Sequence, residues 1–82
     1  MADDISIQHR ITSLIDEEHR LRGALQTGSI SVDEEHARLR VLEVELDQCW
    51  DLLRQRRAKR EFGDNPDEAQ VRSERTVEGY LG

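Results

Sequence analysis

The chain has 82 residues, enough for one small domain, and 37% of them are charged while 35% are hydrophobic. No run of hydrophobic residues is longer than two, which excludes a membrane-spanning helix, so we expect no membrane association. The net charge of −6 argues against a general binder of polyanions, and the single cysteine excludes a disulfide within the chain. Together with the acidic start of the sequence, the lone cysteine favours a cytoplasmic protein.

The first predicted element is a helix over residues 4–27. Asp3 or Asp4 can cap its start, because a short side-chain oxygen accepts hydrogen bonds from the free backbone N–H groups there. Gly28 suits the left-handed backbone conformation that follows many helix ends. Mostly apolar residues recur along this helix at alternating steps of four and three, which is the heptad spacing of a helix that packs along one seam. The seam consists of Ile7, Ile11, Leu14, Glu18, Leu21 and Leu25.

The second predicted helix covers residues 32–61. Ser31 followed three residues later by Glu34 is a capping box, in which each side chain satisfies a backbone N–H group of the other. The helix contains neither Gly nor Pro, and Gly63 ends it. It carries a second heptad seam, which consists of Val32, Glu35, Leu39, Leu42, Leu46, Cys49 and Leu53.

The short connection at Gly28 and Ser29 forces the two helices to pack side by side and antiparallel. The predicted fold is therefore all-α, a coiled-coil-like helical hairpin over residues 1–62. A hairpin of this size buries little apolar surface, and its second helix has a further apolar stripe that the seam cannot cover. We therefore expect a homodimer in which two hairpins pair into a four-helix bundle. The further stripe consists of Ala37, Val41, Val44 and Leu52.

Residues 63–82 form a mostly polar tail in which a few apolar residues are scattered. Asn65 followed by Pro66 is typical of a helix cap and a first-turn proline, so a short helix is predicted over residues 66–72. A tail that only met solvent would have little use for large apolar residues. We expect a partly ordered tail that docks on its own hairpin or on a partner through residues among Val71, Val77, Tyr80 and Leu81.

The string Asp-Glu-Glu-His occurs twice, at residues 16–19 and 33–36. Carboxylates followed by a histidine resemble the ligand sets that helical bundles direct at paired metals. In the predicted register the two strings are offset by roughly 6 Å along the hairpin, and Asp16 and His19 point away from the seam. A solvated charged face is therefore the simpler interpretation, with no cofactor, and metal binding through the two strings is an alternative.

Two glutamates at seam positions, Glu18 and Glu35, need cationic partners, because an unpaired buried carboxylate is costly. Arg22 and Arg38 are placed to supply them, so we predict a buried ion-pair network that fixes the register of the hairpin. A carboxylate pair for acid–base catalysis is the functional alternative. The sequence shows no nucleophile, glycine-rich loop or aromatic pocket beside this pair. We therefore expect that the protein is not an enzyme.

A basic block near the end of the second helix is the one candidate for contact with nucleic acid. Cations in the last turns of a helix also complement its dipole, and acidic residues at the start of the first helix are near enough to neutralise them. Only Phe62 is available nearby for stacking on bases. Nucleic-acid binding is therefore not the role that we expect and is kept as an alternative, through Arg54, Arg56, Arg57, Lys59 and Arg60.

The surplus apolar residues and the lack of chemistry favour a non-catalytic interaction or adaptor module with an unidentified protein partner. Cys49 is expected to be a small core residue. Trp50, on the flank of the seam, is expected to anchor an interface. The predicted interaction surface consists of Val41, Val44, Trp50, Leu52, Tyr80 and Leu81.

Several stretches of the sequence together resemble a known family. They are Ile-Asp-Glu-Glu-His-Arg-Leu-Arg at residues 15–22, Glu-Glu-His-Ala-Arg-Leu-Arg at 34–40, Leu-Asp-Gln-Cys-Trp-Asp-Leu-Leu-Arg-Gln-Arg-Arg at 46–57, and Val-Glu-Gly-Tyr at 77–80. The family comprises short bacterial proteins, chiefly actinobacterial, and is known only as a domain of unknown function. The resemblance implies a bacterial, cytoplasmic, helical protein without an assigned activity. It also implies that the tail is part of the functional unit.

Overall fold

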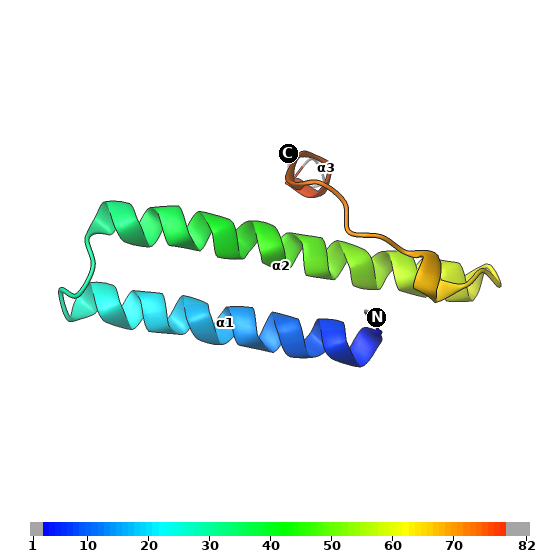
Figure 1. Cartoon of the computed structure of the whole chain (residues 1–82), viewed down its shortest axis with the longest axis horizontal. Helices are drawn as coiled ribbons and strands as arrows, with labels where there is room; N and C mark the ends of the chain where they lie inside the picture. Colours follow the sequence, from blue (N-terminus) through cyan, green and yellow to red (C-terminus); the bar gives the residue numbers. More distant parts are fainter. Residues whose placement is uncertain (1–2, 79–82) are drawn as a thin grey trace.

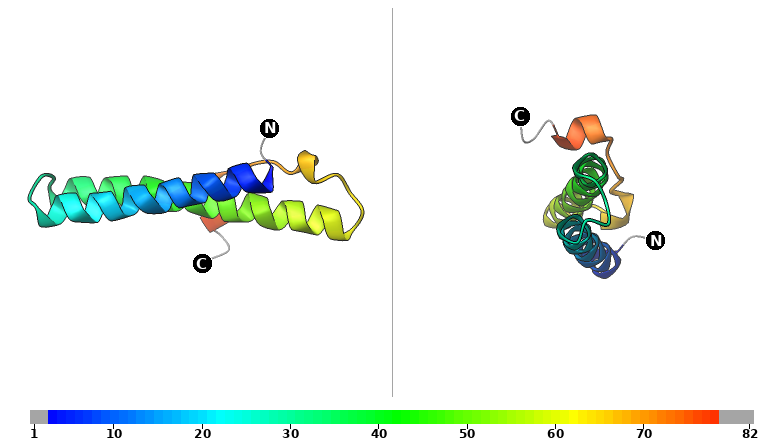
Figure 2. Two further views of the ribbon diagram at one scale, coloured as in Figure 1. Left: turned by 90° about the horizontal axis from the view of Figure 1, so that it is seen from below. Right: turned by 90° about the vertical axis from the view of Figure 1, so that its left-hand side faces the viewer.

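The computed structural model describes residues 3–78, in which two long antiparallel helices carry a C-terminal segment that folds back on them (Figure 1). The long helices are α1 (Asp4–Gln26) and α2 (Val32–Glu61), which lie side by side in the further views as well (Figure 2). The C-terminal segment contains a 3-10 turn, η1 (Pro66–Glu68), and a short helix, α3 (Glu74–Glu78). The predicted all-α hairpin is confirmed for the described part of the chain.

Local capping groups set the bounds of α1. The Asp3 Oδ1 atom accepts a hydrogen bond from the backbone N–H of Ser6 at 2.7 Å, as a helix cap does. At the other end Gly28 has a φ of 75°, and the backbone N–H of Ser29 donates to the carbonyl oxygen of Ala24 at 2.8 Å. This is a Schellman ending, which satisfies free carbonyl groups and turns the chain towards α2.

The same two devices bound α2. The Ser31 Oγ atom accepts from the backbone N–H of Glu34 at 3.1 Å, so this half of the predicted capping box is present. Gly63 has a φ of 77°, and the backbone N–H of Asp64 donates to the carbonyl oxygen of Lys59 at 2.7 Å. Between these caps α2 runs for 30 residues without interruption.

The densest part of the core lies towards the open end of the hairpin, away from the loop at residues 27–31 that connects α1 to α2. Ile7, Ile11 and Leu52 form a buried cluster there. Leu14, one heptad further along α1 from Ile7, is fully buried. Partly buried apolar residues pack against the cluster from α2 and from the C-terminal segment, namely Leu46, Cys49, Leu53 and Ala69.

Leu52 therefore belongs to the core, whereas the sequence placed it on the exposed stripe. An α-helix has 3.6 residues per turn, so the face that it presents to a straight partner drifts by about 20° per heptad. The drift brings Leu52 towards α1 beside Leu53. Its side chain is 6% exposed and cannot contact another protein in this fold.

The C-terminal segment runs back along α2, antiparallel to it. Gln55 donates through Nε2 to the carbonyl oxygen of Gln70 at 2.7 Å, and Gln48, two turns nearer the loop, donates to the carbonyl oxygen of Arg72 at 3.1 Å. These amide side chains hold an extended stretch of backbone that has no ladder of its own. The segment thus docks on its own hairpin.

The end of this segment covers part of the exposed stripe of α2. Arg40 contacts Glu74 at 2.9 Å, so α3 lies over the face of α2 between Arg40 and Gln48. Val44 lies on that face, four residues from each of them, and is partly buried. Val77 of α3 is 2% exposed. Figures 1 and 2 show α3 beside α2 and away from α1.

The helix predicted over residues 66–72 is shorter in the structure. Asn65 caps it as expected, accepting from the backbone N–H of Asp67 at 3.0 Å, but only the turn Pro66–Glu68 forms. Ala69 then adopts an extended conformation, with φ −64° and ψ 139°, and packs on the core cluster. Contacts with α2 outweigh the weak helix preference of so short a stretch.

Candidate protein interaction groove

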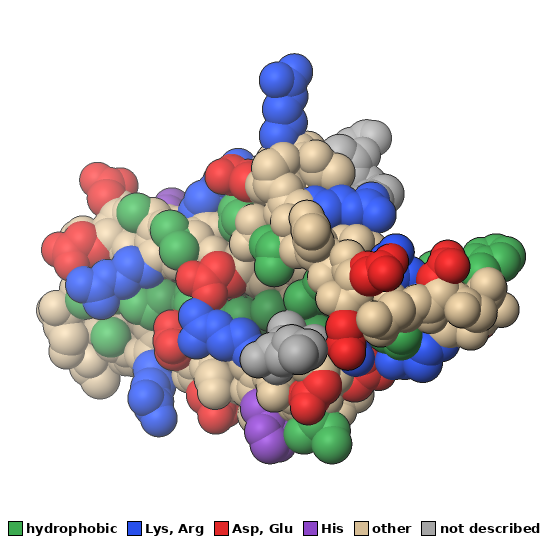
Figure 3. All heavy atoms as spheres, turned by 45° about the vertical axis from the view of Figure 1, so that its right-hand side comes forward, with side chains coloured by type: hydrophobic (Ala, Val, Ile, Leu, Met, Phe, Trp, Pro, Cys, Tyr) green, Lys and Arg blue, Asp and Glu red, His purple; other side chains and the backbone are tan. Residues whose placement is uncertain are grey.

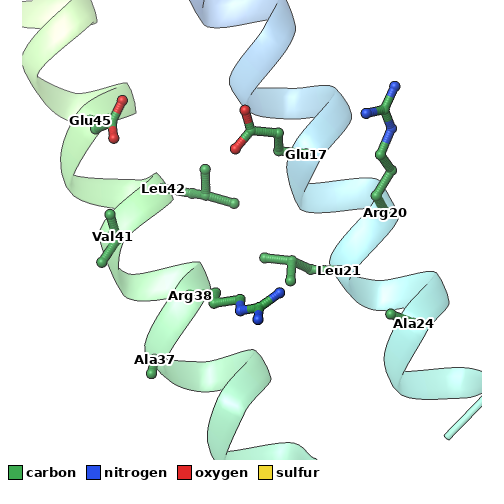
Figure 4. Close-up of a pocket in the computed structure, with 9 residues that line it drawn as sticks. All are labelled: Glu17, Arg20, Leu21, Ala24, Ala37, Arg38, Val41, Leu42 and Glu45. Carbon is green, nitrogen blue, oxygen red and sulfur yellow. The ribbon is translucent and has the colours of Figure 1, made fainter. Parts of the chain in front are cut away.

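A groove runs between α1 and α2 in the half of the hairpin nearer the loop (Figure 4). Its volume is about 660 Å³, and no described residue of the C-terminal segment contributes to its lining. Two kinds of side chain line it, apolar ones along the floor and charged ones at the rim. The lining consists of Glu17, Arg20, Leu21 and Ala24 from α1 and of Ala37, Arg38, Val41, Leu42 and Glu45 from α2.

The floor of the groove is apolar and partly open to water. Leu42 is 6% exposed, but Val41 beside it is 58% exposed. Ala24 on α1 and Ala37 on α2 line the groove nearer the loop, where their small side chains fill little of it (Figure 4). In Figure 3 green apolar side chains fill the band between the two long helices, with red and blue side chains along it. An uncovered apolar band of this kind favours a contact that removes it from water.

The charges at the rim follow a simple order. On each helix an acidic residue lies farther from the loop and an arginine lies nearer to it, Glu17 before Arg20 on α1 and Glu45 beyond Arg38 on α2 (Figure 4). Glu45 also pairs with Arg10 at 2.5 Å, and this hydrogen bond raises the pKa of Arg10. Within residues 3–78 neither Arg20 nor Arg38 forms an ion pair, so both guanidinium groups are available to a partner.

The predicted ion-pair network forms only in part. Glu18 and Arg22 contact each other at 3.1 Å along one face of α1, four residues apart. Glu35 is buried, and its carboxylate lies 3.8 Å from Nε2 of His36, which attracts it only when the imidazole is protonated. Arg38 lies on the rim of the groove instead. The carboxylate of Glu18 keeps contact with water, so it does not require a second cation from across the hairpin.

Part of the basic block closes the open end of the hairpin. Arg56 is buried, and its guanidinium contacts Asp4 at 2.5 Å and Asp67 at 3.1 Å. Arg60 contacts the second oxygen of Asp4 at 2.7 Å. The hydrogen bonds from Arg60 and Arg56 lower the pKa of Asp4 to about 2. We call Asp4, Arg56, Arg60 and Asp67 the open-end junction, because it ties α1, α2 and η1 together.

The open-end junction makes the basic block less available to a nucleic acid. Two of its five cations are committed to carboxylates of the same chain, and Arg54 also has a contact within the chain. Arg57 is exposed and Lys59 is half-buried. A phosphate backbone would have to compete with the carboxylates of the junction for the most central guanidinium groups, so the structure gives the nucleic-acid alternative little support.

The predicted interaction surface is divided by the fold. Val41 lies in the groove, and Trp50 is 48% exposed on α2. Val44 is partly covered by α3, while Leu52 lies in the core. Tyr80 and Leu81 lie outside the described residues. Of the six predicted residues, the structure thus leaves Val41 and Trp50 as the accessible ones among those that it describes.

Three other features of the sequence can be compared with the structure. Within residues 3–78 no three side chains of His, Cys, Asp or Glu come together in a way that could hold a metal ion, which gives metal binding through the two Asp-Glu-Glu-His strings no support. Cys49 packs against the core cluster, and burial raises the pKa of its thiol. None of the helices in the described part is long and apolar enough to span a bilayer.

Sequence reasoning missed the importance of Glu17 and Arg20. The sequence pattern places Glu17, as part of its Asp-Glu-Glu-His string, on a solvated charged face and assigns no role to Arg20. The available signal was the neighbouring small residue Ala24, which together with Ala37 on the other helix leaves a gap where a larger residue would close the seam.

Comparisons with known proteins give the chain a family and leave its function undescribed. A family model described as protein of unknown function (DUF2630) matches residues 3–82. Uncharacterized proteins of Mycobacterium tuberculosis and Mycobacterium bovis are 54% identical to it over 80 residues, which cover 98% of this chain and 91% of theirs. No solved structure matches the chain.

Proposed function

This chain belongs to the DUF2630 family of proteins of unknown function, and we propose that it is a non-catalytic protein interaction module. The observation that carries the proposal is the groove, which combines an apolar floor with a rim of ordered charges. Burial of the floor would supply binding free energy, and the rim would select the partner and its orientation.

The chemistry of the groove supports binding over catalysis. The described residues that line it are Glu, Arg, Leu, Ala and Val, and these offer no hydroxyl, thiol or imidazole as a nucleophile or base. Glu17 at its rim is exposed and Glu45 is half-buried, so neither carboxylate is enclosed as a catalytic acid or base usually is. An adaptor role requires only that the groove bind another surface.

Two further features of the proposal come from the sequence. We propose a cytoplasmic location, which the single free thiol of Cys49 supports. We also propose Trp50 as a second contact, since a tryptophan that is 48% exposed offers a large apolar area to a partner.

Site-specific photo-cross-linking in living cells tests the proposal. A photoreactive phenylalanine at position 41 lies in the groove, whereas the same residue at position 62 replaces Phe62, which is 81% exposed and outside the groove. We expect a discrete cross-linked product from position 41 and none from position 62. Absence of any product from position 41, or the same products from both positions, would contradict a groove-binding module.

A further inference from the structure

The charge order of the groove identifies a partner. Resting on the proposed function, we propose that the groove is filled by a second copy of this chain, turned end for end. The two hairpins would then form a four-helix bundle with their loops at opposite ends. In this arrangement α1 packs against the partner's α1 and α2 against the partner's α2, each pair antiparallel.

The two charge pairs at the rim define where the two-fold axis of the dimer would lie. On α1 the midpoint between Glu17 and Arg20 lies close to residue 18, and on α2 the midpoint between Arg38 and Glu45 lies close to residue 42. The contacts of Arg10 with Glu45 and of Asp4 with Arg56 fix which positions of the two helices are level. By that register the two midpoints lie within about one helical turn of the same level. A single two-fold axis can therefore pass close to both.

Rotation about that axis makes the rim complementary to itself. Glu17 meets the partner's Arg20, and Arg38 meets the partner's Glu45. Because a two-fold axis repeats every contact, each pair forms twice. Arg20 and Arg38, which form no ion pair within residues 3–78, thereby both gain a carboxylate, and that of Glu45 is shared with Arg10 of its own chain. Val41 lies next to the axis, so the apolar floor is at the centre of the contact, where burial contributes most.

The alternative dimer, in which both loops lie at the same end, is disfavoured by repulsion between like charges. If the axis ran parallel to the helices, the loops would lie at the same end and α1 would face the partner's α2. Arg20 would then lie near the partner's Arg38, since these two positions are nearly level, and Glu17 would lie towards the partner's Glu45. Like charges opposite each other disfavour that arrangement, so the rim selects the end-for-end one.

The C-terminal segment as far as residue 78 lines no part of the groove, and α3 lies beside α2 away from α1 (Figures 1 and 2). The loop lies about ten residues from the axis, or roughly 15 Å, so the partner's loop would end near the level of Gln8. The open-end junction begins at Asp4, beyond that level, and stays free of the partner.

Charge-reversed variants of the full chain test the pairing. By light scattering after size exclusion at about 100 µM, a concentration that detects even weak dimers, we expect a wild-type dimer. E17R places two arginines opposite the partner's two arginines, and R20E places glutamates opposite glutamates. Each variant alone should dimerise at least tenfold more weakly, while an equimolar mixture of the two should form a heterodimer. The double variant E17R/R20E should dimerise like the wild type.

A spin-label distance tests the orientation. In the C49S background, labels at S29C would lie roughly 30 Å apart in the end-for-end dimer, because each loop is about ten residues from the axis. A much shorter distance would place the loops at the same end and overturn the proposal. Circular dichroism of every variant must show the wild-type helix content, and R57E, a reversal outside the groove, serves as the matched control that should leave dimerisation unchanged.

The outcomes separate this inference from the proposed function. A wild-type monomer whose position 41 cross-links to a different protein would overturn the second copy as occupant and leave the interaction module standing. A dimer that persists in both single variants and in V41D would form through another face, which overturns the second copy as occupant of the groove. The interaction module would fail as well only if position 41 gave no cross-linked product. Failure of the mixed variants to associate would overturn the end-for-end pairing.

Discussion

The open end and the loop end of this hairpin are built from the same two helices but use them differently. At the open end Ile7, Ile11 and Leu52 are buried, and the chain's own C-terminal segment closes the surface. Towards the loop end Val41 is 58% exposed, and the C-terminal segment up to residue 78 does not line the groove. The open end therefore holds the fold together, whereas the groove near the loop is left for a partner.

This contrast shows how a very small core can be supplemented within one chain. A two-helix hairpin buries too little surface to be stable by a wide margin. Ala69 adds an apolar contact to the core cluster, Val77 is buried where α3 packs on α2, and the open-end junction adds ionic contacts. The half without such a supplement is the half that would gain most from association.

Matched truncations of leucine should show the largest difference between the two ends. Leu52→Ala leaves a cavity in the buried cluster and should lower the free energy of unfolding by about 3 kcal/mol. Leu21→Ala removes a half-buried side chain from the groove floor and should cost about 1 kcal/mol. Urea unfolding followed by circular dichroism, at one low protein concentration, measures both. Equal losses would mean that the core extends evenly along the hairpin.

Removing the apolar anchor of the C-terminal segment should have a smaller effect. Val77→Ala, at a position that is 2% exposed, should cost about 2 kcal/mol, because the side chain loses its contacts on α2. Val71→Ala, at a position that is 63% exposed, is the control and should stay within about 0.5 kcal/mol of wild type. Hydrogen exchange should locate the loss in α3 and leave α1 protected. Uniform loss of protection across the chain would show that the segment is not a separate layer.

Two glycines near the loop should respond with opposite sign. Gly28 has a φ of 75°, so Gly28→Ala should lower the free energy of unfolding by about 1 kcal/mol. Gly23 lies inside α1 with nothing within 4 Å of an added Cβ, so Gly23→Ala should raise it by up to about 1 kcal/mol. Thermal melting compares the two. A stabilising Gly28→Ala would show that the loop does not need its left-handed residue.

The smallest expected effect is the dependence of the open-end junction on pH. Its hydrogen bonds lower the pKa of Asp4 from 3.8 to about 2, so the charged form is favoured by folding. This contribution is fully present above pH 3.8 and is lost as the pH falls towards 2. The melting temperature of Asp4→Asn should therefore lie below that of wild type at pH 5 and approach it at pH 2. A difference that did not narrow with falling pH would contradict the junction.

Local patterns were sufficient for the helices and their ends. Asp3, Ser31, Gly28 and Gly63 act through groups within a few residues of themselves, so sequence reasoning could place them. The groove was harder to predict, because Glu17 and Arg20 form its charged rim only together with Arg38 and Glu45 on the other helix. Only the packing of α1 against α2 brings these four residues to one rim.

A hairpin of two long helices packed along one apolar seam follows from the sequence, since periodicity and capping are properties of neighbouring residues. Which residues are buried in that seam and which stay exposed depends on how the helices pack. In the folded chain Leu52 lies in the core, α3 covers the face of Val44, and Arg56 pairs with Asp4. Each of these depends on helix drift, on docking of a distant segment or on a pair of charges 52 residues apart, and none can be read from local spacing.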